Sequence, residues 1–448
     1  MKKYFIISTL AAFALSGNIA NAQDFDTDPV IKIENKKEDV KFTIGARMMA
    51  DAAYYHSEFT PMKSGASIVD ARLRASMSFE DWYFYADFGF GNGKFAQKNL
   101  FLQYSRELQK GMHVFKAGYY NNPIGMSRNT SSGSMHFITR PGSVMALGTG
   151  RELGISYKYY NNTFFANQGV FAENKYNDQI AGFQGVSVGG RWLYRPINDD
   201  KITLHVGAGF RFANICTGET VEGSVLKTNY HIGTSLETYV DNTDMFVSAD
   251  MPWAKHIFDV SAEALFKTPD FFVRGEYMYK SVTKDRDDET LFENGLGSID
   301  SWGTLESWRG GNPLGTNKFM GGYVEAGYKL FGNDYRYSNA DGILKGLDGK
   351  ALEIVARYSY TGLNDLVDGE YYSAARDQYY PNGMIADYPA TSKSIGGGNL
   401  HSASVGLNFA FNKYAQIMVN YTYNYLDRDK FGHDKNFHAV QTRLQFQF

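Results

Sequence analysis

The side chains of this sequence that are best suited to chemistry are basic, and several lie close together. Between Ala117 and Arg151, a run of 35 residues contains three arginines and no acidic residue. Arg72 and Arg74 are two residues apart, so both point to the same side if the chain is extended there. Guanidinium groups bind anions through charge and paired hydrogen bonds. The pattern therefore indicates attraction of anionic solutes rather than bond-breaking chemistry.

Other kinds of chemistry have little support in the sequence. The nine histidines are scattered without the spacing of a metal site, and no nucleophile motif stands out. The glycine-rich stretch 89–93 is not followed by a helical pattern, as a phosphate-binding loop would require. We therefore expect no catalytic site, no metal and no cofactor, and we do not expect an enzyme.

The N-terminus has the features of an export signal. A basic start at Lys2 precedes an apolar run over residues 4–16 and a small-x-small sequence at 20–22. We interpret residues 1–22 as a signal peptide and residues 23–39 as a periplasmic segment before the folded domain.

The rest of the chain is neither a helical membrane protein nor a basic one. No later segment has the run of about 18 apolar residues that a membrane-spanning helix needs. Without the signal peptide, 43 basic residues stand against 48 acidic ones, so nothing suggests a nucleic-acid partner.

Alternation with a period of two residues dominates the remaining sequence. At the C-terminus, His438, Val440, Thr442, Leu444, Phe446 and Phe448 alternate with Ala439, Gln441, Arg443, Gln445 and Gln447. The same pattern recurs at 69–79, 202–212, 258–266 and 403–411. Such stretches run to about 9–13 residues, enough for a tilted strand to cross a bilayer, whereas strands of soluble domains usually have about 5–6.

We therefore predict an all-β protein, a transmembrane antiparallel β-barrel over residues 40–448, located in the cell outer membrane. The connections alternate between short and long, as expected for short periplasmic turns and long extracellular loops. Sixteen strands are predicted, at 40–53, 68–79, 82–90, 98–106, 112–119, 151–160, 163–173, 186–195, 201–212, 256–266, 271–282, 319–331, 349–360, 400–411, 415–425 and 436–448. An alternative counts eighteen, with 228–240 and 243–251 as an added pair. One turn, 332–348, is long for the periplasmic side.

The polar faces of these strands would line an aqueous lumen with a modest excess of positive charge. Fourteen basic and nine acidic residues fall on them. A competing interpretation is that opposite charges on neighbouring strands pair with each other and stiffen the wall. The candidate pore-lining and anion-binding residues are Arg72, Arg74, Lys116, Arg128, Arg140, Arg151, Arg191 and Arg211.

Several short motifs follow one another along nearly the whole mature chain. They are Ala71-Arg72-Leu73-Arg74, Lys116-Ala117-Gly118-Tyr119, Asn122-Pro123-Ile124-Gly125, Phe137-Ile138-Thr139-Arg140, Gly150-Arg151-Glu152-Leu153-Gly154, Arg274-Gly275-Glu276-Tyr277-Met278, Arg357-Tyr358-Ser359-Tyr360, Leu363-Asn364-Asp365, Gly406-Leu407-Asn408-Phe409 and Val419-Asn420-Tyr421. This ordered series resembles the phosphate-selective porin O and P family, although that family commonly has Pro-Phe where this chain has Pro123-Ile124.

The resemblance implies a sixteen-stranded, usually trimeric barrel that passes small anions through a lumen lined with basic side chains. It also implies that the loop after the fifth strand, here 120–150, folds inward and narrows the pore. Charge would matter most there: two unit charges 4 Å apart interact by about 1 kcal/mol in bulk water and by about 4 kcal/mol at an effective dielectric constant of 20.

Our hypothesis is therefore a passive, water-filled porin that prefers phosphate or other small anions. We expect a homotrimer in contact with outer-membrane lipid and lipopolysaccharide. The alternative is a structural or adhesin barrel at the cell surface whose lumen is plugged; a channel would raise the permeability of liposomes to small anions, and a plugged barrel would not.

Overall fold

The computed structural model describes residues 31–35, 39–57, 62–172, 185–215, 220–221, 224–225, 230–242, 246–251, 254–284, 304–307, 316–365, 395–427 and 435–448. The proposed signal peptide at 1–22 lies outside these residues. No helix among the described residues is long and apolar enough to span a bilayer.

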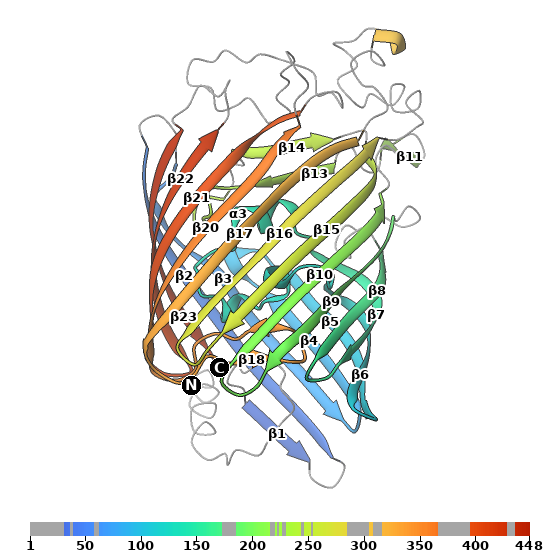
Figure 1. Cartoon of the computed structure of the whole chain (residues 1–448), viewed down its shortest axis with the longest axis vertical. Helices are drawn as coiled ribbons and strands as arrows, with labels where there is room; N and C mark the ends of the chain where they lie inside the picture. Colours follow the sequence, from blue (N-terminus) through green and yellow to red (C-terminus); the bar gives the residue numbers. More distant parts are fainter. Residues whose placement is uncertain are drawn as a thin grey trace, which may run out of the picture.

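Sixteen antiparallel strands form a closed barrel (Figure 1). They are β2 (Val40–His56), β3 (Gly65–Phe79), β4 (Trp82–Gly89), β5 (Ala96–Leu108), β6 (Gly111–Asn121), β7 (Arg151–Tyr160), β8 (Phe164–Ala172), β9 (Val186–Asn198), β10 (Thr203–Asn214), β15 (Ala254–Lys267), β16 (Phe271–Lys284), β17 (Thr316–Phe331), β20 (Ala351–Asp365), β21 (Ile395–Ala410), β22 (Ala415–Asp427) and β23 (Asn436–Gln447). Each strand pairs with its neighbours in sequence, and β2 pairs with β23 to close the ring. The predicted count of sixteen is confirmed.

The two faces of each strand have opposite environments. On β23, Val440, Leu444 and Phe446 are 46%, 48% and 44% exposed on the outside, whereas the polar Gln441 and Arg443 between them are buried toward the inside. This is the reverse of a soluble sandwich, in which the apolar row would be buried. Because lipid cannot hydrogen-bond a free strand edge, a sheet with such an outer face must close on itself.

The eighteen-stranded alternative is wrong. β10 pairs directly with β15 along its whole length, from Thr203 with Lys267 to Asn214 with His256. The added segments form β13 (Tyr230–Thr234) and β14 (Val247–Met251), which pair only with each other. Five residues each are too few to cross a bilayer. Their alternation reflects a small two-stranded sheet that lies inside the barrel (Figure 1).

Within the proposed N-terminal segment 23–39, the structure contains a further strand. β1 (Ile31–Asn35) pairs with the beginning of β2, from Ile31 with Ile44 to Asn35 with Val40. It extends beyond the barrel wall at the end where the C-terminus lies (Figure 1).

Three segments occupy the barrel interior. The first, here called the inner loop, covers 122–150 and contains α2 (Met126–Asn129), the 3-10 turn η3 (Ser132–Ser134) and α3 (Gly142–Leu147). The extracellular hairpin comprises the described residues 230–242 and 246–251. The periplasmic hairpin covers 332–350 with β18 (Tyr337–Ser338) and β19 (Ile343–Leu344), which accounts for the unusual length of that turn.

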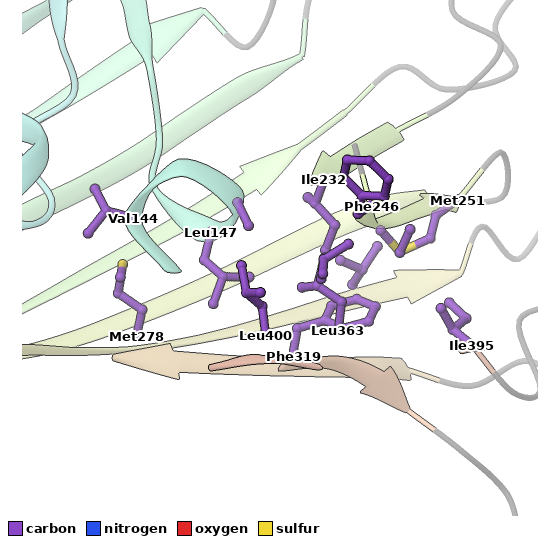
Figure 2. Close-up of a cluster of buried hydrophobic side chains, with 14 of the residues drawn as sticks. Val144, Leu147, Ile232, Phe246, Met251, Met278, Phe319, Leu363, Ile395 and Leu400 are labelled. Atoms are coloured by element: carbon purple, nitrogen blue, oxygen red, sulfur yellow. The ribbon is translucent and has the colours of Figure 1, made fainter. Parts of the chain in front are cut away.

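An apolar cluster joins the inner loop to the extracellular hairpin (Figure 2). Val144 and Leu147 of α3 belong to the same buried cluster as Ile232 and Phe246 of the hairpin and Phe319 of the wall. All five side chains are almost completely shielded from solvent. The two segments therefore form a single packed body against β16, β17, β20 and β21.

Because the outward rows face lipid, a charged side chain placed on them should reduce the free energy of unfolding, and more so near the middle of the bilayer than at its surface. Val405, exposed near the middle of β21, faces the centre of the apolar band, whereas Phe411 lies at the periplasmic rim. We expect Val405→Arg to lower the free energy of unfolding by about 2–4 kcal/mol and Phe411→Arg by about 0–1 kcal/mol. Urea unfolding in lipid vesicles measures both, and equal penalties at the two depths would contradict the assignment of this face to lipid.

Candidate pore constriction

Glu276 of β16 holds the start of α2 in the inner loop. Its carboxylate accepts hydrogen bonds from the backbone N–H groups of Met126 (2.9 Å) and Ser127 (3.0 Å). These groups belong to the first turn of a helix, where N–H donors lack partners within the helix. Gly125 precedes them with φ +84°, and a Cβ there would come within 2.6 Å of Glu276 Oε1. Glycine thus allows the loop backbone to approach the wall.

A second wall carboxylate holds the middle of the inner loop. His136 Nδ1 lies 2.9 Å from Glu353 Oε1, and both side chains are buried. Asn408 of β21 donates from Nδ2 to the backbone oxygen of His136 and to Glu353, each at 2.7 Å. Phe272 packs against the imidazole with ring centroids 4.6 Å apart.

A third carboxylate comes from the extracellular hairpin. Glu237 accepts a hydrogen bond from the backbone N–H of Gly142 (2.7 Å), at the start of α3. Arg357 of β20 pairs with the same carboxylate at 2.7 Å and donates to the backbone oxygen of Thr139. Glu237 therefore links the hairpin, the inner loop and the wall.

The first and last barrel strands also contact the inner loop. Arg47 of β2 donates to the hydroxyls of Ser131 (3.2 Å) and Ser132 (2.8 Å). Gln445 of β23 donates to the backbone oxygen of Gly133 at 3.1 Å. The segment around η3 is thus held by both strands at once.

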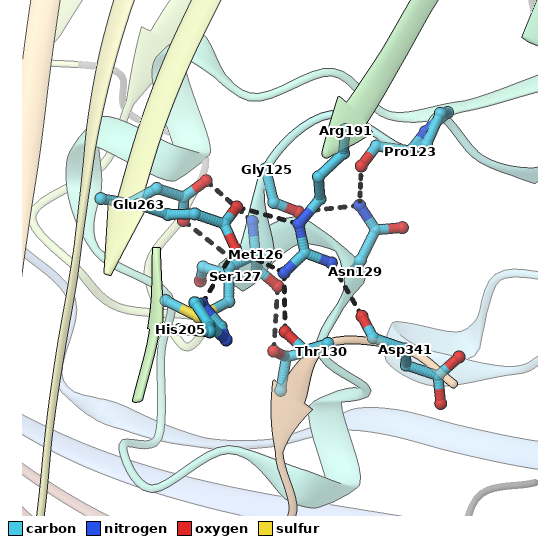
Figure 3. A network of polar contacts seen from close by, with 12 residues as sticks. Pro123, Gly125, Met126, Ser127, Asn129, Thr130, Arg191, His205, Glu263 and Asp341 are labelled. Atoms are coloured by element: carbon cyan, nitrogen blue, oxygen red, sulfur yellow. Dashed lines mark hydrogen bonds and ion pairs between the residues drawn. The ribbon is translucent and has the colours of Figure 1, made fainter. Parts of the chain in front are cut away.

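Three of the predicted site residues pair with acids of the wall. Arg72 contacts Asp70 and Asp87, and Arg211 contacts Glu152 and Asp259, at distances of 2.7–3.2 Å. Arg191 pairs with Glu263 at 2.6 Å and also donates to the backbone oxygens of residues 341 and 342 (Figure 3). These three charges lie in the lumen wall, but each is balanced by a carboxylate.

The periplasmic hairpin also contacts cations on its side of the lumen, with backbone oxygens and one carboxylate. Its backbone oxygens accept hydrogen bonds from Lys158 at residue 340 and from Arg195 at residue 339. Asp341 lies 3.6 Å from the ammonium of Lys158. Burial alone would raise the pKa of Asp341, but the neighbouring Lys158 lowers it below its ordinary value. The carboxylate is therefore charged at neutral pH.

The three arginines of the acid-free stretch have a different environment. Arg128 donates to the backbone oxygen of Thr149 (2.8 Å), and Arg140 donates to the backbone oxygens of Ser127 and Thr130. Arg151, at the start of β7, donates to the side-chain oxygen of Asn99 at 2.9 Å. All three are half-buried, and within the described part of the chain none forms an ion pair with an acid.

These arginines are close enough to repel one another. Burial and the neighbouring Arg140 lower the pKa of Arg128 to about 10, so the guanidinium remains protonated at neutral pH. Arg151 lies within electrostatic range of both, of Arg72 and of the carboxylate of Asp87. Neutral oxygens orient the three guanidinium groups without cancelling their charge, which leaves an electropositive cluster at the inner loop.

The remaining two predicted residues lie on the lumen side of the wall. Arg74 on β3 is buried. Lys116 on β6 is half-buried, with its ammonium 4.2 Å from the ring centre of Phe101 and 5.1 Å from that of Tyr120.

Comparison with known proteins agrees with this architecture. The sequence model of the family described as "Phosphate-selective porin O and P" matches residues 42–448, nearly the whole barrel. The chain belongs to this porin family. It is accordingly an outer-membrane porin, a channel-forming barrel. No curated protein matches the chain.

Solved structures share the fold of this porin at low sequence identity. The anion-selective porin from Comamonas acidovorans has a TM-score of 0.52 and 11% identity, over 91% of this chain and 100% of that one. A loop-deletion form of OmpT from Vibrio cholerae has a TM-score of 0.51 and 9% identity, over 91% and 99% of the two chains. OprB from Pseudomonas putida has a TM-score of 0.50 and 9% identity, over 91% and 94%.

The sequence analysis did not identify some residues of this candidate constriction. Lys98 is within electrostatic range of Arg72 and Arg151 and adds to the positive cluster. The alternation pointed the other way, because Lys98 is in phase with the outward residues Leu100 and Leu102. The register shift opposite Lys98, between Asp87 and Phe88, could not be predicted from the sequence. The sequence contains no signal for Glu237 and His136, because each contacts a residue more than 90 positions away in the chain.

The anchoring of α2 predicts the effect of changing Glu276. In Glu276→Gln, an amide group replaces one of the two acceptor oxygens and faces a buried N–H donor, a cost of about 1–3 kcal/mol. We expect larger open-channel current fluctuations in planar bilayers as the inner loop loosens. The exposed rim variant Glu107→Gln is the control, and unchanged noise in Glu276→Gln would show that this contact does not fix the loop.

Proposed function

We propose that this porin conducts small solutes passively, without chemical turnover, and prefers anions, phosphate among them. The observation that carries the proposal is the cluster of Arg128, Arg140 and Arg151. Its charges are oriented by neutral oxygens, whereas Arg72, Arg191, Arg211 and Arg357 are each paired with a carboxylate. The description of the family supports phosphate as one of the anions.

The geometry makes electrostatic selection effective at this place. The inner loop fills part of the lumen, so a passing ion approaches the guanidinium groups where little water screens them. At an effective dielectric constant of about 20, one such charge at 4 Å contributes about 4 kcal/mol, which attracts an anion and repels a cation. Rings of basic side chains are the expected device of an anion-conducting pore.

We divide the eight candidate residues according to whether a carboxylate pairs with the cation. Arg128, Arg140 and Arg151 form the proposed anion site, with Lys98 as an added member and Lys116 farther along the lumen. Arg72, Arg74, Arg191 and Arg211 line the pore, and the ion pairs of Arg72, Arg191 and Arg211 chiefly stabilise the wall. Both interpretations of lumen charge therefore apply, but to different residues.

We further propose a homotrimer embedded in outer-membrane lipid and lipopolysaccharide. Family membership supports the assembly, and the continuous outward apolar rows support the lipid contact. Chemical cross-linking in intact membranes tests the stoichiometry, and a ladder that ends at the monomer would refute it.

The anion proposal predicts a loss of selectivity when the cluster is neutralised. We expect the triple variant Arg128→Gln, Arg140→Gln and Arg151→Gln to shift the reversal potential under a salt gradient toward zero. The control is Lys413→Gln, a cation in an exposed periplasmic turn, which should leave the potential unchanged. An unaltered potential in the triple variant would refute the site.

The channel itself predicts permeability, which also separates it from a plugged barrel. Liposomes that contain the protein should swell in isotonic potassium phosphate and in small neutral sugars, while empty liposomes should not. Absence of swelling with folded, inserted protein would favour the structural or adhesin alternative.

A further inference from the structure

A continuous row of aromatic rings lies on the lumen side of β4, β5 and β6. Tyr83 and Tyr85 are two residues apart on β4, with ring centroids 6.2 Å apart and planes 23° from parallel. Phe101 of β5 is the register partner of Tyr85, with centroids 5.3 Å apart and planes at 26°. Tyr120 of β6 continues the row at 6.0 Å from Phe101, and Phe171 of β8 follows at 5.7 Å. We call these five residues the aromatic strip.

The strip faces the lumen and not the lipid. Tyr85 has the same orientation as Asp87 two residues later, whose carboxylate binds Arg72 inside the barrel. Phe84, between Tyr83 and Tyr85, is among the exposed residues of the outer face. A lipid-facing aromatic girdle therefore does not account for the strip.

The strip leads from the periplasmic end of the barrel to the constriction. Tyr83 follows the short turn between β3 and β4, and Tyr120 is the next-to-last residue of β6, where the inner loop begins. Tyr83, Tyr85 and Phe101 keep part of their surface exposed, while Tyr120 and Phe171 are buried. The periplasmic hairpin contacts Lys158, Arg191 and Arg195 on β7 and β9, and its Asp341 lies within electrostatic range of Lys116.

A cation is placed on this row. The ammonium of Lys116 lies over the rings of Phe101 and Tyr120, at 4.2 and 5.1 Å from their centres. Within the described residues, no side chain or carbonyl accepts a hydrogen bond from it. Its three N–H donors are therefore left for water or a solute.

We propose that the aromatic strip with Lys116 is a binding site for anionic monosaccharides, such as sugar phosphates and uronic acids. The apolar face of a sugar ring packs on aromatic faces, which bury large area at low entropic cost, and the ammonium binds the phosphate or carboxylate attached to the ring. This inference extends the proposed anion preference from inorganic ions to ring-bearing ones, and it rests on that proposed function.

Such a site has a specific electrical signature. A sugar phosphate should bind the strip and Lys116 together, whereas inorganic phosphate has no ring to place on the strip. In planar bilayers, we expect glucose 6-phosphate to half-block the chloride current at a concentration roughly fivefold to tenfold lower than inorganic phosphate. If the half-blocking concentrations of inorganic phosphate and glucose 6-phosphate have a ratio near one in the wild-type porin, the proposal is overturned.

Variants separate the strip from the constriction. In the double variant Tyr85→Leu and Phe101→Leu, the ratio of the two half-blocking concentrations should fall to near one, whereas Phe101→Tyr should retain it. Arg140→Gln, in the inner loop, should weaken block by both anions equally and leave the ratio unchanged. A ratio that persists in the double variant overturns the assignment to the strip.

Two further measurements keep the outcomes distinguishable. The reversal potential reports the anion preference independently of block. A wild-type reversal potential without anion preference refutes the proposed function. The ratio of the half-blocking concentrations of inorganic phosphate and glucose 6-phosphate tests the sugar site separately. Benzyl phosphate serves as the second probe: if it blocks more strongly than glucose 6-phosphate, the strip selects aromatic anions and the sugar assignment is wrong. Heat-dependent migration on gels confirms that each variant forms a folded barrel.

Discussion

Buried carboxylates in the wall must find hydrogen-bond donors, and in this porin the inner loop supplies them. Glu276 and Glu353 on the wall and Glu237 on the extracellular hairpin receive the backbone N–H groups of two short helices and the imidazole of His136. Acids used as anchors no longer balance cations elsewhere in the loop. The positive charge of the constriction therefore follows from the way in which the loop is fixed.

The barrel and its contents follow from a single division of the strands into two faces. The outer rows are apolar because they meet lipid, and the inner rows are polar because a lumen can hydrate or pair them. Inside, three segments from both ends of the barrel pack against the wall. The periplasmic hairpin supplies a carboxylate to Lys158 and backbone oxygens to Arg191 and Arg195. The wall of β4, β5 and β6 has a different, aromatic surface.

The sequence was sufficient to predict the strands of the barrel wall but not the contacts among the segments inside the barrel. A period of two over long stretches located all sixteen strands, and the shortage of acids between Ala117 and Arg151 identified the cluster of loop arginines. The contacts between segments inside the barrel could not be predicted, because contacts such as that of Glu237 with Gly142 join distant segments without a local sequence pattern. The alternation at 228–251 was misleading for the same reason: it indicates a strand but not which sheet contains it.

The inner loop also has a mechanical consequence for the barrel. The first and last strands meet without a covalent turn to join them, and a ring of strands is weakest along such a seam. Asp51 of β2 pairs with Arg443 of β23 directly across it. Arg47 and Gln445 donate hydrogen bonds to the inner loop from opposite sides of the seam, so the loop holds the two strands together from inside the barrel. A substitution that displaces this part of the loop would therefore also remove contacts made by both strands at the seam.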